Sequence, residues 1–155
     1  GVNFQCLPMN PEWLSYNTSV HDPNAHLVSK ISSVVYISKD YNIFPSSVND
    51  RRALCAQCYT QTRPAVTVIP GRMSCPMSWT REYYGYLMAS YEHYLHPSSY
   101  ICVDKDPESR PHSNSGYGGG LAFVSADCEG GGTLDECSTG EYVDKRQLTC
   151  TVCSR

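Results

Sequence analysis

The stretches RRALCAQCYT (Arg51–Thr60) and QLTCTVCSR (Gln147–Arg155) carry the same motif, two cysteines separated by two residues. Two such CxxC pairs allow three interpretations: a four-thiolate zinc site, a redox-active dithiol, or cysteines that are each bonded to a distant strand. A zinc site of this kind is usually built from nearby hairpins, and a redox CxxC needs the helix start of a thioredoxin-like unit. Neither pattern surrounds these pairs, so structural disulfides are favoured and no metal or cofactor is expected.

The intervals that end in the CxxC pairs indicate an internal repeat, because Cys6 to Cys55 and Cys102 to Cys150 are nearly equal in length. Around the first cysteines, CLPMNPEW aligns with CVDKDPES, and between them VVYISKDY (Val34–Tyr41) aligns with LAFVSADC (Leu121–Cys128). Several landmarks in one order are the signature of a duplicated unit. We therefore predict a first repeat, N-terminally incomplete, over residues 1–63 and a second over residues 64–155.

Composition places the chain outside the cell. Its 155 residues include nine cysteines and 12 tyrosines, and 41% of the residues are hydrophobic. This cysteine content is typical of secreted domains braced by disulfides. The chain begins with glycine, which indicates processing, and it contains no apolar run of the roughly 18 residues that a membrane helix needs. The net charge of −3 offers no basic footprint for nucleic acid. We expect a secreted, extracellular protein without membrane insertion, with a glycosylation sequon at Asn17.

The predicted secondary structure is almost entirely β. Runs rich in β-branched and aromatic residues are separated by clusters of Gly, Pro, Asn and Ser, and helix signals are weak throughout. The fold class that follows is all-β, disulfide-braced and pseudo-duplicated. The predicted strands are Ala65–Pro70, Arg81–Tyr91, Ser98–Val103, Gly120–Ala126 and Gln147–Cys153.

One disulfide follows from the repeat alone. In the alignment, Tyr41 stands where the second repeat has Cys128, and the first repeat has no counterpart of Cys137. Two cysteines that are absent together are expected to pair with each other, so we predict a Cys128–Cys137 bond.

The run CAQCYTQTRPAVTVIPGRMSCPMSWTREYYGYLMAS (Cys55–Ser90) resembles the junction between the two subdomains of the terminal noncollagenous domain of type IV collagen. There a CxxC ends one copy, and Ile-Pro, Cys-Pro, Trp and Gly-Tyr follow in that order. Through YLMAS, YICVDKDPES and LTCTVCSR the chain more closely resembles the C-terminal domain of spongin-like short-chain collagens of sponges and other invertebrates. The resemblance covers nearly the whole chain, although this chain has no Gly-X-Y tract.

The resemblance implies a nested set of disulfides, and it leaves Cys58 without a partner. It also implies that the counterpart of Val66 to about Ser98 lies ahead of Gly1. The first repeat would then lack two covering strands, so we expect a homo-oligomer or a nicked two-chain assembly with the edge of the first repeat in the interface. The implied disulfides are Cys6–Cys55, Cys75–Cys153, Cys102–Cys150 and Cys128–Cys137.

Three classes of function are compatible with such a chain. Tyrosines with nearby acids and imidazoles suit a lectin, since flat aromatic faces stack on sugar rings, and repeated sites bind multivalently. The alternative is a structural assembly module of the extracellular matrix that binds no sugar. An enzyme is disfavoured, because neither Gly-x-Ser-x-Gly nor His-Glu-x-x-His is present. We expect a multivalent lectin for glycans or glycoproteins, with N-acetylhexosamines as the ligands that best suit a tyrosine-lined pocket.

The candidate sugar-binding residues cluster in two segments of the second repeat, SYEHYLH (Ser90–His96) and DKDPE (Asp104–Glu108), and in one segment of the first. The alternating acids also suggest a calcium site, but the EF-hand pattern is missing. The predicted sugar-binding residues are Tyr91, Glu92, His93, Asp104 and Asp106, with Asn10, Glu12 and Trp13 as first-repeat candidates.

Overall fold

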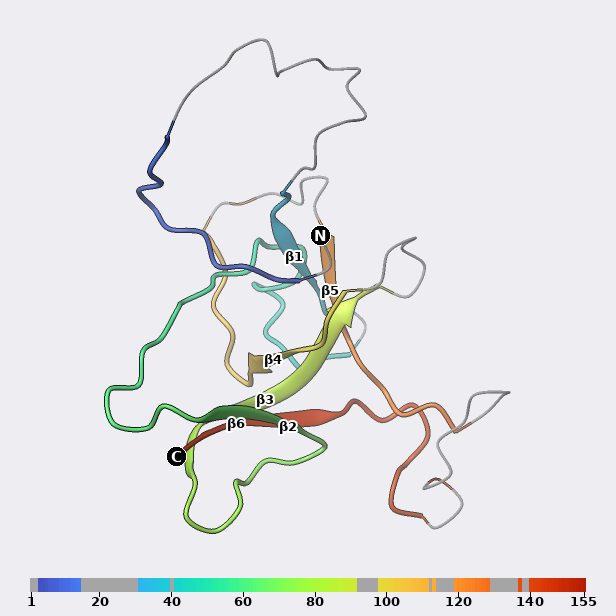
Figure 1. Cartoon of the computed structure of the whole chain (residues 1–155). Coiled ribbons are helices and arrows are strands. Elements are labelled where there is room, and N and C mark those ends of the chain that lie inside the picture. Colours follow the sequence, from blue (N-terminus) through green and yellow to red (C-terminus); the bar gives the residue numbers. More distant parts are fainter. Residues whose placement is uncertain are drawn as a thin grey trace.

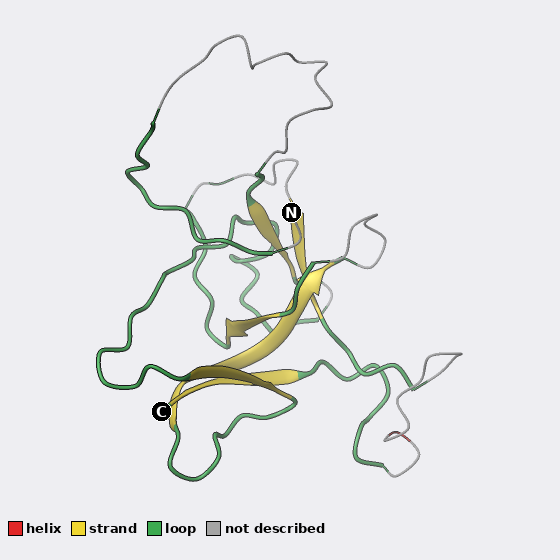
Figure 2. Ribbon diagram, viewed as in Figure 1, coloured by secondary structure: helices red, strands yellow, loops and turns green. Residues whose placement is uncertain are grey.

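The computed structural model describes residues 3–14, 31–39, 41–91, 98–111, 113, 119–128, 137 and 140–155. Within these residues the chain forms one mixed six-stranded sheet, which confirms the predicted all-β class (Figures 1 and 2). The order along the sheet is β1-β5-β3-β6-β2, and β4 pairs with β3 beside this path. The strands are β1 (Val34–Ile37), β2 (Val66–Pro70), β3 (Thr80–Ser90), β4 (Ile101–Asp104), β5 (Gly119–Phe123) and β6 (Thr149–Ser154).

All five predicted strands are present, and their ends differ from prediction for local reasons. Strand β4 starts at Ile101 rather than Ser98, because Ser90 and Ser98 bond reciprocally: the backbone N–H of each donates to the hydroxyl of the other, at 2.8 and 2.9 Å. Beyond Phe123, the end of β5, the chain continues only as an isolated bridge between Ser125 and Gln147.

Strand β3 is the centre of the core, because its alternating side chains are buried on both faces. Met88 is fully buried in an aromatic cluster, in which the Phe44 and Phe123 ring centroids are 4.9 Å apart. On the opposite face, Leu87 packs against the Cys102–Cys150 disulfide. The sheet therefore has a packed layer on each side.

Residues of the two predicted repeats share this one core. Strand β1, from the first repeat, pairs in parallel with β5 of the second, with Val35 opposite Gly120. Tyr36 of β1 is buried and its hydroxyl donates to the Glu108 carbonyl oxygen at 3.2 Å; burial, with a smaller contribution from the charge of Glu108, raises the pKa of Tyr36 to about 12.

A pair of side-chain hydrogen bonds recurs in the two halves of the sequence. The Ser38 N–H donates to Asn49 Oδ1 at 2.9 Å, and the Cys128 N–H donates to Asp144 Oδ1 at 2.9 Å. Each acceptor side chain precedes a residue with positive φ, Asp50 at 56° and Lys145 at 60°. The two segments thus turn in the same unusual way.

The backbone hydrogen bonds around these turns also match one for one. Asp50 and Tyr36 are joined by a 2.9 Å N–H to carbonyl bond, and Lys145 and Ala126 are joined by the same bond at the same length. Two further matched pairs are Tyr36 to Arg51 with Ala126 to Arg146, and Ala53 to Val34 with Leu148 to Val124.

These matches correct the register of the sequence alignment. The residue of the first repeat that corresponds to Cys128 is Ser38, not Tyr41. The alignment of the two apolar runs was therefore shifted by three residues. Apolar similarity alone leaves the register of a strand open, whereas its hydrogen-bond partners fix it. In the corrected alignment, the counterpart of β6 is the segment Leu54–Tyr59, called here the 54–59 segment.

Four disulfides brace the chain, and they are the four that the family resemblance implies. Two close on β6, through Cys150 and Cys153, and Cys58 is a free, exposed thiol. Several disulfides are typical of proteins in oxidising, extracellular compartments. The bonds join Cys6 to Cys55, Cys75 to Cys153, Cys102 to Cys150, and Cys128 to Cys137.

Candidate functional site

The predicted sugar-binding residues of the second repeat lie at opposite ends of one strand pair. Tyr91 directly follows β3 and is 43% exposed, whereas Asp104 ends β4 and pairs with Gly85 on β3. The stretch of β3 between Gly85 and Tyr91 spans roughly 20 Å at ~3.3 Å per residue. Tyr91 is therefore too far from Asp104 and Asp106 to line the same sugar-binding pocket. Glu92, His93 and the sequon residue Asn17 lie outside the described residues.

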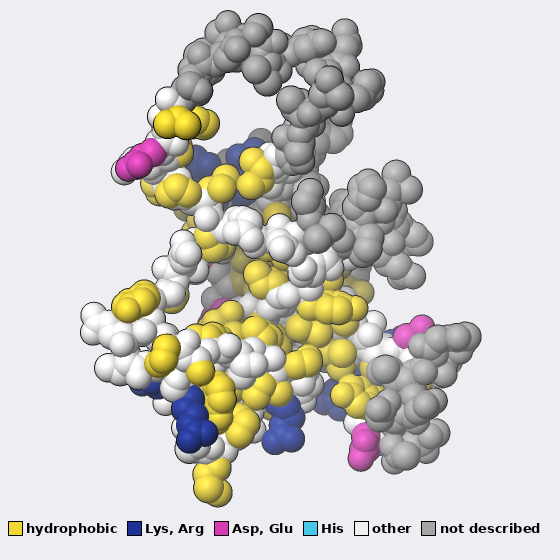
Figure 3. All heavy atoms as spheres, in the orientation of Figure 1, with side chains coloured by type: hydrophobic (Ala, Val, Ile, Leu, Met, Phe, Trp, Pro, Cys, Tyr) yellow, Lys and Arg dark blue, Asp and Glu magenta, His cyan; other side chains and the backbone are white. Residues whose placement is uncertain are grey.

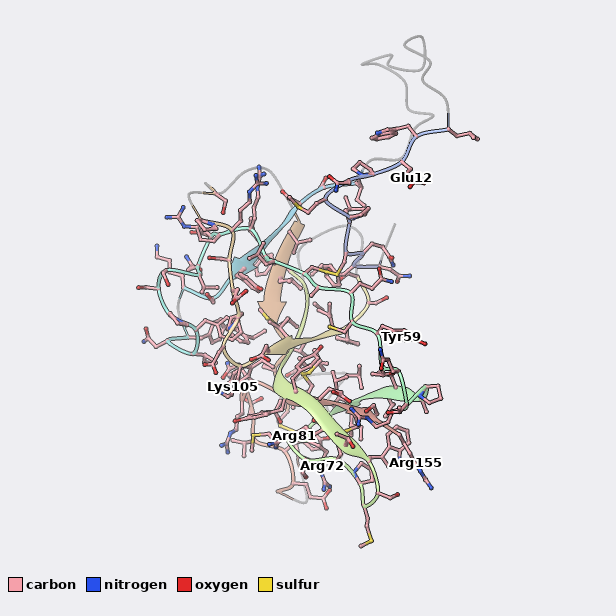
Figure 4. All side chains as sticks on the ribbon, turned by 90° about the vertical axis from the view of Figure 1, so that its left-hand side faces the viewer. Glu12, Tyr59, Arg72, Arg81, Lys105 and Arg155 are labelled. Carbon is pink, nitrogen blue, oxygen red and sulfur yellow. A yellow bond between two sulfur atoms is a disulfide. The ribbon has the colours of Figure 1, made fainter. Side chains whose placement is uncertain are left out.

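The candidate sugar-binding residues of the first repeat lie at a third location in the structure. Asn10, Glu12 and Trp13 are all exposed on the N-terminal segment, and Trp13 is 82% exposed. Figure 4 shows Glu12 on an arm that leads away from the sheet, far from Lys105. The structure does not bring these residues to the aspartates of β4.

The aspartates do lie beside an aromatic ring that sequence reasoning missed. The Tyr84 ring is half-buried on β3, and the Arg81 guanidinium lies 4.7 Å from its centroid. Lys105 Nζ lies 6.0 Å from the same centroid and forms an ion pair with Asp106. Cations at this distance are attracted by the ring quadrupole. We call Arg81, Tyr84, Asp104, Lys105 and Asp106 the Tyr84 site.

A β-bulge brings Arg81 and Tyr84 to one face. In a regular strand, side chains three residues apart point to opposite faces. Here the pairing with β6 shifts between Arg81 and Tyr83, so that Arg81 pairs with Cys153 and Tyr84 with Thr151. The extra residue in the bulge brings the Tyr84 ring and the Arg81 guanidinium to the same face of the sheet. No apolar or charge pattern in the sequence signals this bulge.

Gly85 holds the aspartate turn close to Tyr84. A Cβ at Gly85 would lie 1.9 Å from the Val103 carbonyl oxygen, so only glycine permits this approach of β4 to β3. Beyond β4, the Asp106 N–H donates to Asp104 Oδ1 at 2.9 Å, and the Lys105 N–H donates to the Tyr84 carbonyl oxygen at 3.2 Å. This Asx turn presents both carboxylates at the surface.

The neighbouring tyrosine, Tyr83, has a structural role. Its hydroxyl donates to the Cys102 carbonyl oxygen at 2.9 Å. Burial raises the pKa of Tyr83, and the nearby Asp104 and Cys58 raise it further. At the surface, the hydrogen bond to Asp106 raises the pKa of Lys105. Lys105 is thus held in its charged form, while the hydroxyl of Tyr83 is committed to the backbone.

The chemistry of the Tyr84 site is that of polar recognition. A half-exposed ring offers an apolar face, and two carboxylates and two cations around it offer acceptors and donors for hydroxyl or amide groups. In the described part of the chain, no cluster of three or more His, Cys, Asp or Glu side chains is arranged to hold a metal ion. Nor do the described residues include a helix long and apolar enough to cross a bilayer.

Comparison with protein families, curated proteins and solved structures gave no match for this chain.

Proposed function

We propose that this protein is an extracellular lectin that binds glycans through the Tyr84 site. The observation that supports the proposal is that the half-buried Tyr84 ring lies near the Arg81 and Lys105 cations, at 4.7 and 6.0 Å from its centroid, beside the Asp104–Asp106 turn. Ring stacking on the apolar side of a pyranose, with charged groups at hydrogen-bonding range of its hydroxyls, is the usual arrangement in a sugar site.

An N-acetylhexosamine is the ligand class that we expect. Its acetamide adds a methyl group, which can lie on the ring, and an N–H and a carbonyl, which suit a carboxylate and a cation. The affinity of one such exposed site is modest, so agglutination requires several copies in one assembly.

Tyr84→Ala tests the proposal, with Tyr84→Phe as the matched control. Removing the ring should lower glycan-array binding and agglutination at least tenfold, because the stacking face is lost. Tyr84→Phe keeps that face and should retain binding within about threefold. Thermal unfolding of both variants checks that they fold.

The double variant Tyr91→Ala with His93→Ala tests the site predicted from the sequence. It should leave glycan binding unchanged, because Tyr91 lies at the other end of β3 from the Tyr84 site. Loss of binding in this variant, with retention in Tyr84→Ala, would overturn the assignment to Tyr84.

The second candidate function is a matrix assembly module, and the exposure of the 54–59 segment favours it. A module of this kind would oligomerise without agglutinating cells. Simple sugars that abolish agglutination would support the lectin, whereas oligomers that bind no glycan on an array would support assembly alone.

A further inference from the structure

The 54–59 segment is the counterpart of β6, yet its surroundings are the opposite. In β6, five of the six residues are buried and the first is half-buried. All six residues of the 54–59 segment are exposed, with Leu54 at 49% and Tyr59 at 85%. Figure 1 shows this segment as a green trace that bows out to the left of the sheet, and Figure 3 shows hydrophobic side chains on that side of the surface.

The backbone of the segment also lacks the partners that β6 has. Thr151 of β6 is flanked by Tyr84 of β3 on one side and by Ile69 of β2 on the other. In the first half of the chain, the Leu54 N–H reaches the Glu108 carbonyl oxygen at 3.5 Å. From residue 55 to residue 59, no backbone hydrogen bond is formed to any described residue. A row of unpaired N–H and C=O groups is a template for strand addition.

The second cysteine of each CxxC pair shows the same difference between the two halves. Cys153 of β6 is fully buried and bonded to Cys75, which comes from the connection between β2 and β3. Its counterpart, Cys58, is free and exposed. The other cysteine of each CxxC pair is bonded in the same way in both halves, Cys55 to Cys6 and Cys150 to Cys102. The missing bond is therefore the one that the connection between two strands like β2 and β3 would supply.

We propose that the 54–59 segment is a strand-acceptor site that binds a two-stranded segment of another polypeptide, built like Val66–Ser90, in which two parallel strands are joined by a connection that carries a cysteine. The 54–59 segment becomes a central strand between these two strands and antiparallel to both, as β6 is between β2 and β3, and the cysteine of the connection bonds to Cys58. The occupant belongs to a separate polypeptide rather than to a second copy, because β2 and β3 of each copy already cover its own β6 and Cys75 is already bonded.

The disulfide forms by oxidation of two thiols. Each thiol loses one proton and one electron, and a low-molecular-weight disulfide of the extracellular space accepts the electrons and becomes two thiols. The new bond joins Cys58 Sγ to the cysteine in the connection of the bound segment.

Disulfide mapping of the natural protein under non-reducing conditions is the primary test. The expected product is a peptide containing Cys58 linked to a cysteine of a different sequence, located between two runs of β-type residues. A free Cys58 thiol in a monomer of about 17 kDa, or a Cys58–Cys58 bond between two copies, would overturn the proposal.

A peptide probe tests the fit of the two-stranded segment directly. The probe is a synthetic peptide of residues 64–91, with its one cysteine, Cys75, activated as a 2-thiopyridyl disulfide. The Cys58 thiolate attacks the cysteine sulfur, the activated S–S bond breaks, and 2-thiopyridone leaves with the proton. The chain with a free Cys58 should couple to one peptide at least tenfold faster than to a scrambled peptide that has the same composition and activated cysteine.

Amide hydrogen exchange then reports whether strands form. Coupling to the probe should slow exchange at least tenfold over residues 54–59, whereas coupling to the scrambled peptide should not. Equal coupling rates for the two peptides, or unchanged exchange after coupling, would reduce Cys58 to a reactive surface thiol and overturn the acceptor site. The Cys58→Ser variant should couple to neither peptide; coupling there would show that another cysteine reacts.

Discussion

The two CxxC pairs have the same spacing and an equivalent disulfide at their first cysteine, but they differ in burial and in the bonding of their second cysteine. Cys150 and Cys153 are fully buried in a central strand, whereas Cys55 and Cys58 lie on an exposed, irregular segment. The turns that precede them are nevertheless built by the same hydrogen bonds. Local sequence thus produces the turn in both places, and the strands that flank the pair decide whether it becomes a strand. A short motif has no fixed structure until distant strands supply its partners.

The largest expected effect is on the buried half of this comparison. Replacing both Cys75 and Cys153 by serine removes a cross-link over a long loop and places hydroxyls where the disulfide was packed, so the free energy of unfolding should fall by about 2–4 kcal/mol. Cys58→Ser, on the exposed half, should change it by less than about 0.5 kcal/mol. Guanidinium unfolding of both variants measures the contrast. Equal losses would show that the two CxxC pairs are energetically alike.

A slightly smaller effect is expected at the strand that covers β6. In Gly85→Ala, the new Cβ would meet the Val103 carbonyl oxygen, which belongs to the backbone and cannot rotate away. We expect a loss of about 1–3 kcal/mol from overpacking, together with weaker glycan binding because the Asp104 turn is displaced. Gly119→Ala, where nothing lies within 4 Å of the added Cβ, is the control and should fold with little loss. Similar stability of the two variants would contradict the close approach of β4 to β3.

The turns that the two halves share provide the third test. Asn49→Ala leaves the Ser38 N–H without its acceptor, so unfolding should become easier by about 0.5–1.5 kcal/mol. Asn49→Asp keeps an acceptor oxygen and should cost less. The comparison fails if alanine and aspartate at this position are equally destabilising in thermal or chemical unfolding.

The smallest expected effect is a pH dependence of stability that arises at the Asp144 turn of the second repeat. The Cys128 N–H holds the pKa of Asp144 below its ordinary value of 3.8, with a smaller contribution from Lys145. A carboxylate with a lowered pKa contributes stability that is fully present above the ordinary value and is lost as the pH falls through the folded-state pKa. Asp144→Asn copies the Asn49 arrangement and should reduce the loss of stability below about pH 4, while Asn49→Asp should add to it. Acid titration followed by circular dichroism measures both changes, and identical acid transitions in all three proteins would refute the assignment.

Much of the fold was predictable because its signals are local. Runs such as Val66–Pro70 and Thr80–Ser90 announce strands by composition, and cysteine spacing indicates a repeat. The register of the repeat was not predictable, because the hydrogen bonds from Ser38 to Asn49 and from Cys128 to Asp144 leave no trace in an apolar alignment.

The candidate site was only half predictable. Asp104 and Asp106 stood out as alternating acids after a strand, and they are part of the Tyr84 site. Tyr84 and Arg81 did not stand out, because a bulge at the pairing with β6 is what turns them to the same face. Tyr91 was grouped with the aspartates by closeness in sequence, but the antiparallel pairing of β3 and β4 separates them.

The sequence by itself determined the β class of this protein, the Cys128–Cys137 bond and the repeated cysteine spacing of its two halves, because residue composition and spacing act through local preference and covalent reach. Tertiary structure alone decided which CxxC pair is buried and which tyrosine meets the aspartates. These outcomes depend on strand partners far away in the chain: β3 pairs with β4, β5 and β6 at once, while the 54–59 segment pairs with no strand among the described residues. The same spacing of cysteines therefore gives a buried strand in one half and an open edge in the other.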